Sequence, residues 1–262
     1  MRFSNPGGDV ARHRAVCSPV TSRRVRLEDR TITVLATGQR RELPPIVMLP
    51  GLGYPGMLGP WLRELSRWTA VELLDLPGWR RGEAVGCPPT VAGVAEATRG
   101  ILPQLAGSPV LVGHSTGAQA ALRAAVEAPD RLTGLVLLGP TVDPSVRSWP
   151  RLTTSYLRGL RRERPAELAA VRRSMREGRV APVVSLIRSA LADRPEERIA
   201  SLRLPTLVLT GEHDRISTPE WCHQLAELSG GRFRLLSGGH NCCYTDAGGA
   251  DDAVRAFVRA VC

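Results

Sequence analysis

A serine between two glycines is the feature of this 262-residue sequence that points most directly to chemistry. Residues 113–117 read Gly-His-Ser-Thr-Gly, after the apolar run 109–112 and before the alanine-rich stretch 118–128. This order predicts a strand, a sharp turn and a helix, with Ser115 at the apex of the turn. Small residues two positions either side of the apex relieve the crowding of such a turn. The helix N-terminus would face negative charge developing beside Ser115, so the pattern favours a nucleophile over an ordinary turn.

A carboxylate and a histidine that could activate this serine follow in chain order. The buried-strand pattern 205–210 leads to Asp214, and the shorter strand 232–236 precedes His240. A serine hydroxyl is a weak nucleophile until a base takes its proton, and a carboxylate can fix the tautomer of that base. We therefore predict a triad of Ser115, His240 and Asp214, in the order expected of one hydrolase architecture.

Other residues compete for two of these roles. Glu212 lies on the same loop as Asp214, and Asp143 follows the strand pattern 135–138, so either could be the acid. We favour Asp214 because a loop just past its strand can reach the histidine without distorting the sheet. His240 could also be a plain loop residue. We expect His114, inside the turn, to point away from the serine.

A glycine-rich loop could supply part of an oxyanion hole. The apolar run 46–49 is followed by Pro-Gly-Leu-Gly at residues 50–53. We expect the main-chain N–H groups of Leu52 and Thr116 to stabilise an oxyanion, because the second donor usually comes from the loop after the third strand. The alternative is a glycine-rich turn without a role.

Taken together, these motifs resemble those of the α/β-hydrolase superfamily, over roughly residues 23–261. The turn Asp-Leu-Pro-Gly at residues 75–78 adds to the likeness, while Pro50 stands where members more often have histidine. The resemblance implies an α/β fold with a mostly parallel eight-stranded sheet flanked by helices and a helical cap insertion. It implies no cofactor and no metal.

The resemblance also implies an enzyme, a serine hydrolase that cleaves an ester, thioester or lactone through an acyl-enzyme. Relatives with a cap include natural-product tailoring enzymes, which hydrolyse C–C bonds or form and cyclise bonds without net hydrolysis. That reaction class is the alternative. A non-catalytic binding protein of the same fold is a third reading, which the intact triad disfavours.

The order of elements supports one α/β domain with an insertion. Continuous apolar strand patterns alternate with helical ones, which is typical of a parallel sheet covered on both faces. We expect a flexible N-terminal segment (1–22), a core in two parts (23–142 and 205–262) and a helical cap (143–204). Trp149 and Tyr156 at the start of the cap are candidates to line a substrate pocket.

Basic residues concentrate in the expected cap. The net charge is +10, every basic residue is arginine, and residues 147–203 hold fourteen Arg against six Asp or Glu. A solvated surface explains this, and steering of an anionic substrate or an acidic carrier domain is the sharper reading. Stacking aromatics do not alternate with the arginines, so we expect no nucleic-acid partner. The partner is then a small-molecule substrate, with the oligomeric state open.

Composition places further bounds on the protein. The sequence has no apolar stretch near the roughly 18 residues of a membrane span, and residues 1–20 lack the apolar core of a secretion signal. The six cysteines lack metal-type spacing. We expect a protein without membrane contact in the reducing cytoplasm, with free thiols and with Cys242 and Cys243 in packing roles.

Overall fold

The computed structural model of the chain describes residues 19–27, 30–39, 41–76, 86–105 and 107–262. The predicted flexible segment 1–22 lies mostly outside the described residues, as do residues 77–78 of the 75–78 turn and residues 28–29.

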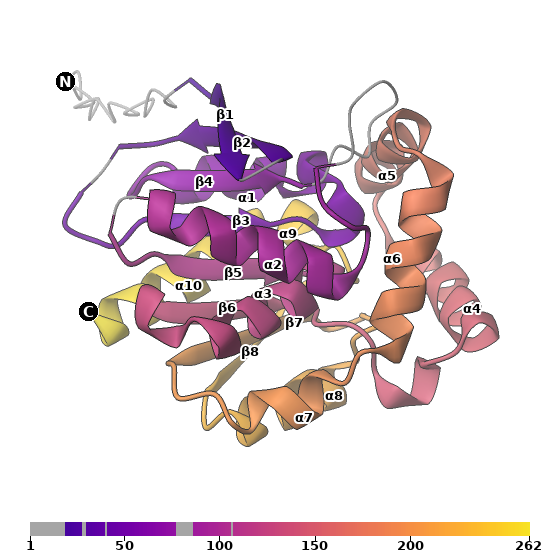
Figure 1. The fold of residues 1–262 in the computed structure, drawn as a ribbon. Coiled ribbons are helices and arrows are strands. Elements are labelled where there is room, and N and C mark those ends of the chain that lie inside the picture. The colour runs from indigo at the N-terminus through magenta and orange to yellow at the C-terminus, as the bar shows by residue number, and fades with distance from the viewer. Residues whose placement is uncertain (1–18, 28–29, 40, 77–85, 106) are drawn as a thin grey trace, which may run out of the picture.

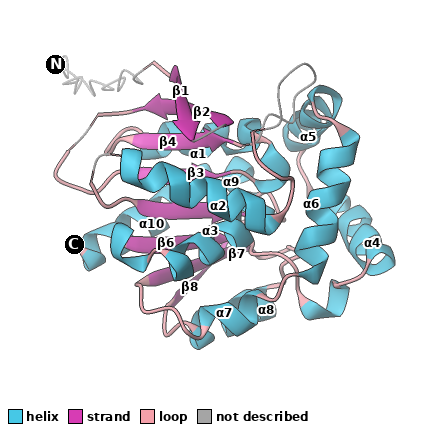
Figure 2. Ribbon diagram, in the orientation of Figure 1, coloured by secondary structure: helices cyan, strands magenta, loops and turns pink. Residues whose placement is uncertain are grey.

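An eight-stranded sheet forms the centre of the molecule, as the resemblance implies (Figures 1 and 2). Its spatial order is β1-β2-β4-β3-β5-β6-β7-β8. The strands β1 and β2 are antiparallel to their neighbours, and the pairs from β4 to β8 are parallel. The strands are β1 (Thr21–Leu27), β2 (Arg30–Thr37), β3 (Ile46–Leu49), β4 (Val71–Asp75), β5 (Val110–His114), β6 (Gly134–Leu138), β7 (Thr206–Gly211) and β8 (Arg232–Leu236).

The central strands are buried along their whole length because helices cover both faces of the sheet. Every residue of β3, β5, β6 and β7 is buried. One face carries α2 (Val91–Ile101), α3 (Thr116–Glu127) and α8 (Pro219–Leu228), and the other carries α1 (Gly59–Leu65) and α10 (Ala247–Val261) (Figure 1). Two hydrophobic clusters, one on each side of the sheet, form the core.

A helical segment separates β6 from β7. It contains α4 (Trp149–Gly159), α5 (Pro165–Glu177), α6 (Val180–Ala192) and α7 (Pro195–Ile199). Figure 1 shows α4, α5 and α6 standing beside the sheet, at the carboxyl ends of the parallel strands. The short helix α7 instead packs against α3 and α8 of the core. We refer to α4, α5 and α6 with their connections as the inserted helices.

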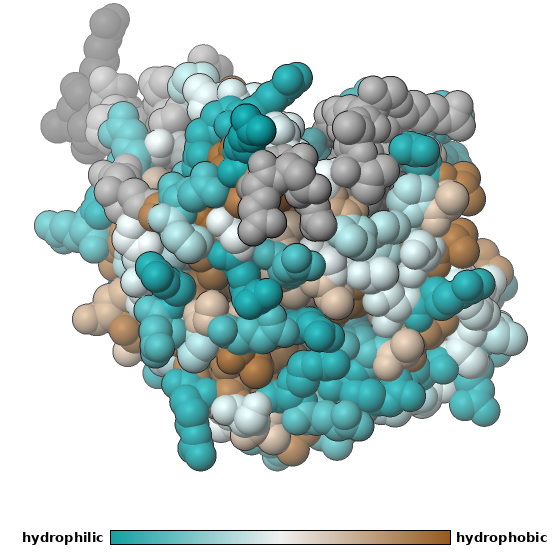
Figure 3. Space-filling model, viewed as in Figure 1, coloured by the Kyte–Doolittle hydropathy of each residue, from teal (hydrophilic) through white to brown (hydrophobic). Residues whose placement is uncertain are grey.

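The outer face of the inserted helices is partly apolar (Figure 3). Within these helices, Leu157, Met175 and Val180 are each more than half exposed. Among the described residues, no helix combines the length and the apolar composition needed to cross a membrane.

Candidate active site

Ser115 occupies the strained turn that the sequence predicts. Its φ of 56° and ψ of −124° lie in a region that L residues rarely adopt, and its N–H donates to Leu138 O at 2.9 Å. A Cβ on Gly113 would lie 2.5 Å from a main-chain atom of α3, and one on Gly117 would lie 2.6 Å from Leu49 O. Only glycine fits at both positions, so the spacing of the motif follows from the packing of this turn.

The pairing of the parallel strands places the loops that follow them near Ser115. The carboxyl ends of β3, β5, β6 and β7 lie level, because Leu49 pairs with Gly113 and Leu138 pairs with both His114 and Leu209. The loops after these strands therefore open at one edge of the sheet, which is where parallel α/β sheets place their sites.

Ser115, His240 and Asp214 lie in one continuous line of hydrogen bonds. The Ser115 Oγ to His240 Nε2 distance is 2.9 Å, and the His240 Nδ1 to Asp214 Oδ2 distance is 2.8 Å. The Asp214 side chain is fully buried, while the His240 side chain is 14% exposed. The predicted nucleophile, base and acid are thus in proton-transfer contact before any substrate binds.

Asp214 is held in its ionised form by its surroundings. Burial alone would raise the pKa of Asp214, but the charge and hydrogen bond of His240 outweigh burial and lower it. The N–H groups of Ile216 and Ser217 donate to Asp214 Oδ1 at 2.8 and 2.9 Å and act in the same direction. The carboxylate can therefore fix the imidazole tautomer.

His240 has a raised pKa for a related reason. Burial alone would lower the pKa of His240, but the charge of Asp214, its hydrogen bond, and the charge of Glu163 together raise it. An imidazole with this bias accepts a proton readily, as a general base must.

The structure places the rival acids elsewhere. Glu212 accepts a hydrogen bond from Ser237 Oγ at 3.2 Å. Asp143 accepts from the Thr218 hydroxyl and the Ser145 N–H. Neither carboxylate contacts His240.

The side chain of His114 was expected to point away from the serine, but it lies next to His240 in the site. Its Nε2 lies 3.1 Å from His240 O, and the two rings are 5.3 Å apart. Burial lowers the pKa of His114 to about 4, so the ring is neutral and its Nε2–H can donate to that carbonyl. His114 thus supports the His240 loop. The sequence could not indicate this contact between residues 126 positions apart.

The residues that carry the two predicted oxyanion donors are joined by a hydrogen bond to a side chain. The Leu52 N–H donates to the Thr116 hydroxyl at 2.9 Å, and Leu52 has a positive φ of 47°. The Thr116 N–H lies at the first position of α3, where an N–H has no partner within the helix. An oxyanion in this place would have to share the Leu52 N–H with the Thr116 hydroxyl or accept directly from the hydroxyl.

An apolar cavity of about 270 Å³ opens onto Ser115 and His240. Both predicted pocket residues, Trp149 and Tyr156, line it. Its remaining apolar walls come from the core and the inserted helices: Leu52, Met57, Val142, Leu152, Val171, Met175, Val183, Ile187, Ala190 and Ile216. Among the described residues that line this cavity there is no arginine.

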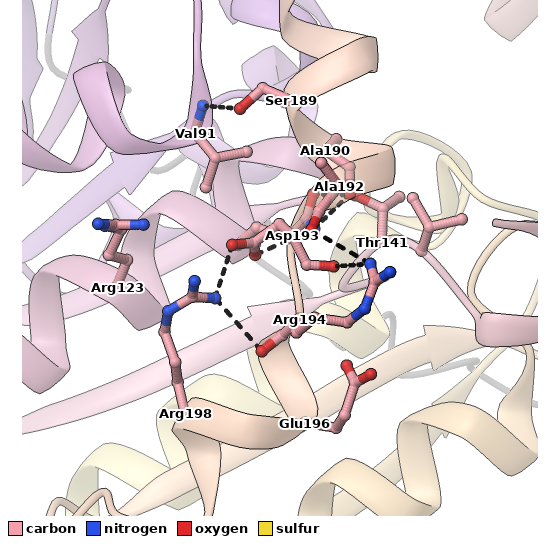
Figure 4. Close-up of polar contacts among 12 residues, drawn as sticks. Val91, Arg123, Thr141, Ser189, Ala190, Ala192, Asp193, Arg194, Glu196 and Arg198 are labelled. Atoms are coloured by element: carbon pink, nitrogen blue, oxygen red, sulfur yellow. Dashed lines mark hydrogen bonds and ion pairs between the residues drawn. The ribbon is translucent and has the colours of Figure 1, made fainter. Parts of the chain in front are cut away.

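Polar contacts fix the end of α6 to the core (Figure 4). The Ser189 hydroxyl accepts from the Val91 N–H at 3.0 Å, so α6 is joined to the start of α2. Buried Gln119 of α3 donates from Nε2 to Ala190 O at 3.1 Å and to Asp193 at 3.2 Å. Arg198 donates to the other oxygen of Asp193 at 2.6 Å. These hydrogen bonds connect α6, which forms part of the cavity wall, to α3, the helix that follows Ser115.

The arginines of the inserted helices are exposed. Arg172, Arg173 and Arg176 line a separate, open hollow between α5 and the loop around Tyr54. Arg147, which precedes α4, has a side chain only 9% exposed; it forms an ion pair with Glu196 at 2.7 Å and lies over the Trp221 ring.

The described residues hold no cluster of side chains suited to a metal ion. Cys242 and Cys243 are free and buried in the hydrophobic core. Burial raises the pKa of the Cys243 thiol to about 12, so it is not a reactive thiolate.

Comparisons with known proteins agree with this architecture. A model of the alpha/beta hydrolase family matches residues 46–260. A hydrolase from Pseudomonas aeruginosa PA01 superposes with a TM-score of 0.77 at 19% identity, covering 91% of this chain and 98% of that one. The enol-lactonase from Burkholderia xenovorans LB400 also gives 0.77, at 22% identity and 90% and 100% coverage. The thioesterase domain from the curacin biosynthetic pathway gives 0.68, at 18% identity and 91% and 99% coverage.

No curated protein sequence matches the chain. The structural likenesses, all under 25% identity, show the fold, and the family model covers most of the sequence. The chain is therefore a member of the alpha/beta hydrolase family.

Proposed function

We propose that this protein is a serine hydrolase that cleaves an ester, thioester or lactone with an apolar, uncharged acyl group. One observation carries the proposal: the line of hydrogen bonds from Ser115 Oγ through His240 to Asp214, at 2.9 and 2.8 Å. A serine in this contact is activated as a nucleophile, whereas a structural serine has no need of a buried imidazole and carboxylate.

The reaction proceeds in two halves. His240 Nε2 takes the Ser115 proton as Oγ attacks the carbonyl carbon, and the imidazolium then returns that proton to the leaving group. Asp214 stays ionised and holds Nδ1–H. Water attacks the resulting acyl-enzyme with His240 again as base, which releases the acid and restores the serine hydroxyl.

The oxyanion of each tetrahedral intermediate is stabilised by the Thr116 N–H and by the linked pair of Leu52 N–H and Thr116 hydroxyl. Because the hydroxyl accepts from Leu52, its own proton is free to point at the substrate oxygen. Each such donor contributes roughly 2.7–4 kcal/mol in measured cases.

The cavity indicates the substrate class. Its apolar walls and the absence of arginine among its described lining residues favour an uncharged acyl chain or ring over a carboxylate. The inserted helices act as a cap in this proposal, since α4, α5 and α6 supply much of the wall.

A series of p-nitrophenyl esters from acetyl to medium-chain acyl tests the proposal. We expect turnover to rise with acyl length until the cavity is full, and Ser115→Ala to lower kcat by at least about 10³-fold. Succinyl-type esters with a terminal carboxylate are the matched controls and should react poorly. Undiminished turnover by the Ser115→Ala protein would reject the mechanism.

A further inference from the structure

Glu163 places a second carboxylate against the His240 loop. It lies between α4 and α5, at the corner where the chain enters α5. A Cβ on Gly239 would lie only 2.6 Å from Glu163 Oε1, so the carboxylate packs directly on the main chain beside His240. The neighbouring Arg164 reaches Thr245 O at 3.5 Å, at the end of the short helix Cys242–Thr245 that follows the His240 loop.

One oxygen of the Glu163 carboxylate is buried, and no arginine among the described residues pairs with this carboxylate. Glu163 Oε2 is inaccessible to solvent and accepts no hydrogen bond from the described residues. The chain has 35 basic residues, all of them arginine, yet none of those described pairs with Glu163. A partly buried carboxylate without such a cation needs another group to stabilise its charge. Across the described part of the chain, no ion pair within 4 Å involves Glu163.

The groups around Glu163 identify that source. Burial has the largest effect and leaves the pKa of Glu163 above its ordinary value, while the His240 imidazolium, the Asn241 side chain and the His240 N–H act in the opposite direction and favour the ionised form. The other titratable groups nearby are Asp214 and neutral His114 on the core side, with the Tyr156 hydroxyl and the buried Cys243 thiol. His240 is therefore the only one of these groups that becomes a cation.

We propose that Glu163 is a second acidic positioning residue for His240, which holds the turn 239–241 and faces the imidazolium with a negative charge. The inference rests on the proposed function, because it assigns a partner to the base of that reaction. Asp214 fixes His240 from the core, and Glu163 fixes it from the inserted helices. The inserted segment then contributes to catalysis as well as to the substrate cavity.

The pH profile of Ser115 labelling tests this role without knowledge of the substrate. The rate of inactivation by a fluorophosphonate reports the fraction of His240 that is neutral. In Glu163→Gln, which keeps the shape and removes the charge, we expect the acid limb to move down by about 0.5–1 pH unit. We expect the plateau rate to fall about 3- to 10-fold. In Glu163→Asp the limb should move back towards the wild-type position.

Glu167→Gln is the matched control. Glu167 is also a buried carboxylate with an unpartnered oxygen on the same segment, but its other oxygen lies near the Arg164 N–H instead of His240. Its profile should coincide with that of the wild type. A role confined to structure would lower the Glu163→Gln plateau without moving the limb, and that result would overturn the proposal.

A second variant covers the case in which Glu163→Gln does not fold. Gly239→Ala pushes a methyl group against Glu163 Oε1 and should displace the carboxylate, which moves the limb in the same direction. An unmoved limb there would also count against the role. If Ser115→Ala were labelled at the wild-type rate, the proposed function itself would fail, and that outcome is distinct from an unmoved limb in the Glu163 variants.

Discussion

Thr116 offers a hydroxyl that the motif spacing alone does not require. Glycine and serine set the shape of the turn, whereas the residue after the nucleophile needs only a main-chain N–H. Here its hydroxyl accepts from the Leu52 N–H and so links both predicted oxyanion donors. Leu52, the donor of this hydrogen bond, and Ser115, which precedes Thr116, both have a positive φ.

Removing that hydroxyl should weaken transition-state binding more than substrate binding. We expect Thr116→Val to lower kcat about tenfold or more with little change in KM, because the oxyanion exists only during reaction. Thr116→Ser keeps the hydroxyl and should stay within about threefold of the wild type. Steady-state kinetics on one ester decides the matter, and equal kcat values for valine and serine would show that the hydroxyl takes no part.

The pH dependence of the reaction follows from His240. Its folded pKa lies above the ordinary value of 6.5, so kcat/KM should rise with pH through that raised pKa as the ring becomes neutral. Asp214→Asn removes the largest charge that raises the pKa, so the acid limb should shift to lower pH. The plateau should fall by about 10⁴-fold, by analogy with measured triads. A limb that stays in place would mean that another group controls it.

At the scale of elements, the end of α6 depends on a buried polar network. Asp193 accepts from both Gln119 and Arg198, and Thr141 donates to Gln119 Oε1 at 2.9 Å (Figure 4). Asp193, Gln119 and Thr141 are buried, so each of these three needs its partner.

Asp193→Ala should therefore destabilise the protein by about 2–4 kcal/mol, because it leaves Gln119 and Arg198 without their shared acceptor. Urea unfolding followed by circular dichroism measures the loss. Asp252→Ala, on the exposed side of α10, is the control and should change the free energy of unfolding by less than about 0.5 kcal/mol. Equal losses in both variants would show that the network adds nothing.

The helix α6 also separates cavity from solvent. Val183 lines the cavity, while its neighbour Val184 is 40% exposed and lies outside the lining. We expect Val183→Trp to lower kcat/KM for medium-chain esters about tenfold and to spare acetyl esters, because the new ring fills the space that the longer chain needs. Val184→Trp should leave both unchanged. A uniform loss across chain lengths in Val183→Trp would argue that this cavity does not hold the acyl group.

At the scale of the whole molecule, local patterns predict the sheet well. The apolar run at residues 46–49 and the short strand expected at 232–236 become strands with those bounds, and the predicted mostly parallel sheet is confirmed. These segments are readable because each strand is short, continuous and bounded by turn residues. The helix α2 ends at Ile101, and Pro103 lies in the tighter 3-10 turn that follows it.

The residues that sequence reasoning missed act across long separations. His114, Glu163 and Gln119 gain their roles only when the inserted helices and the His240 loop pack on the core. A single sequence carries no period or spacing for such contacts. Ser115, Asp214 and His240 were accessible because each follows a strand pattern at one edge of the sheet.

Covalent labelling of the whole protein tests the central claim most directly. After treatment with a fluorophosphonate, intact-protein mass spectrometry and peptide mapping should show one adduct, on Ser115, in the wild type. The Ser115→Ala protein should show none, and His240→Ala should react at least about 10³-fold more slowly. An adduct on another residue, or labelling of Ser115 that does not depend on His240, would contradict the account.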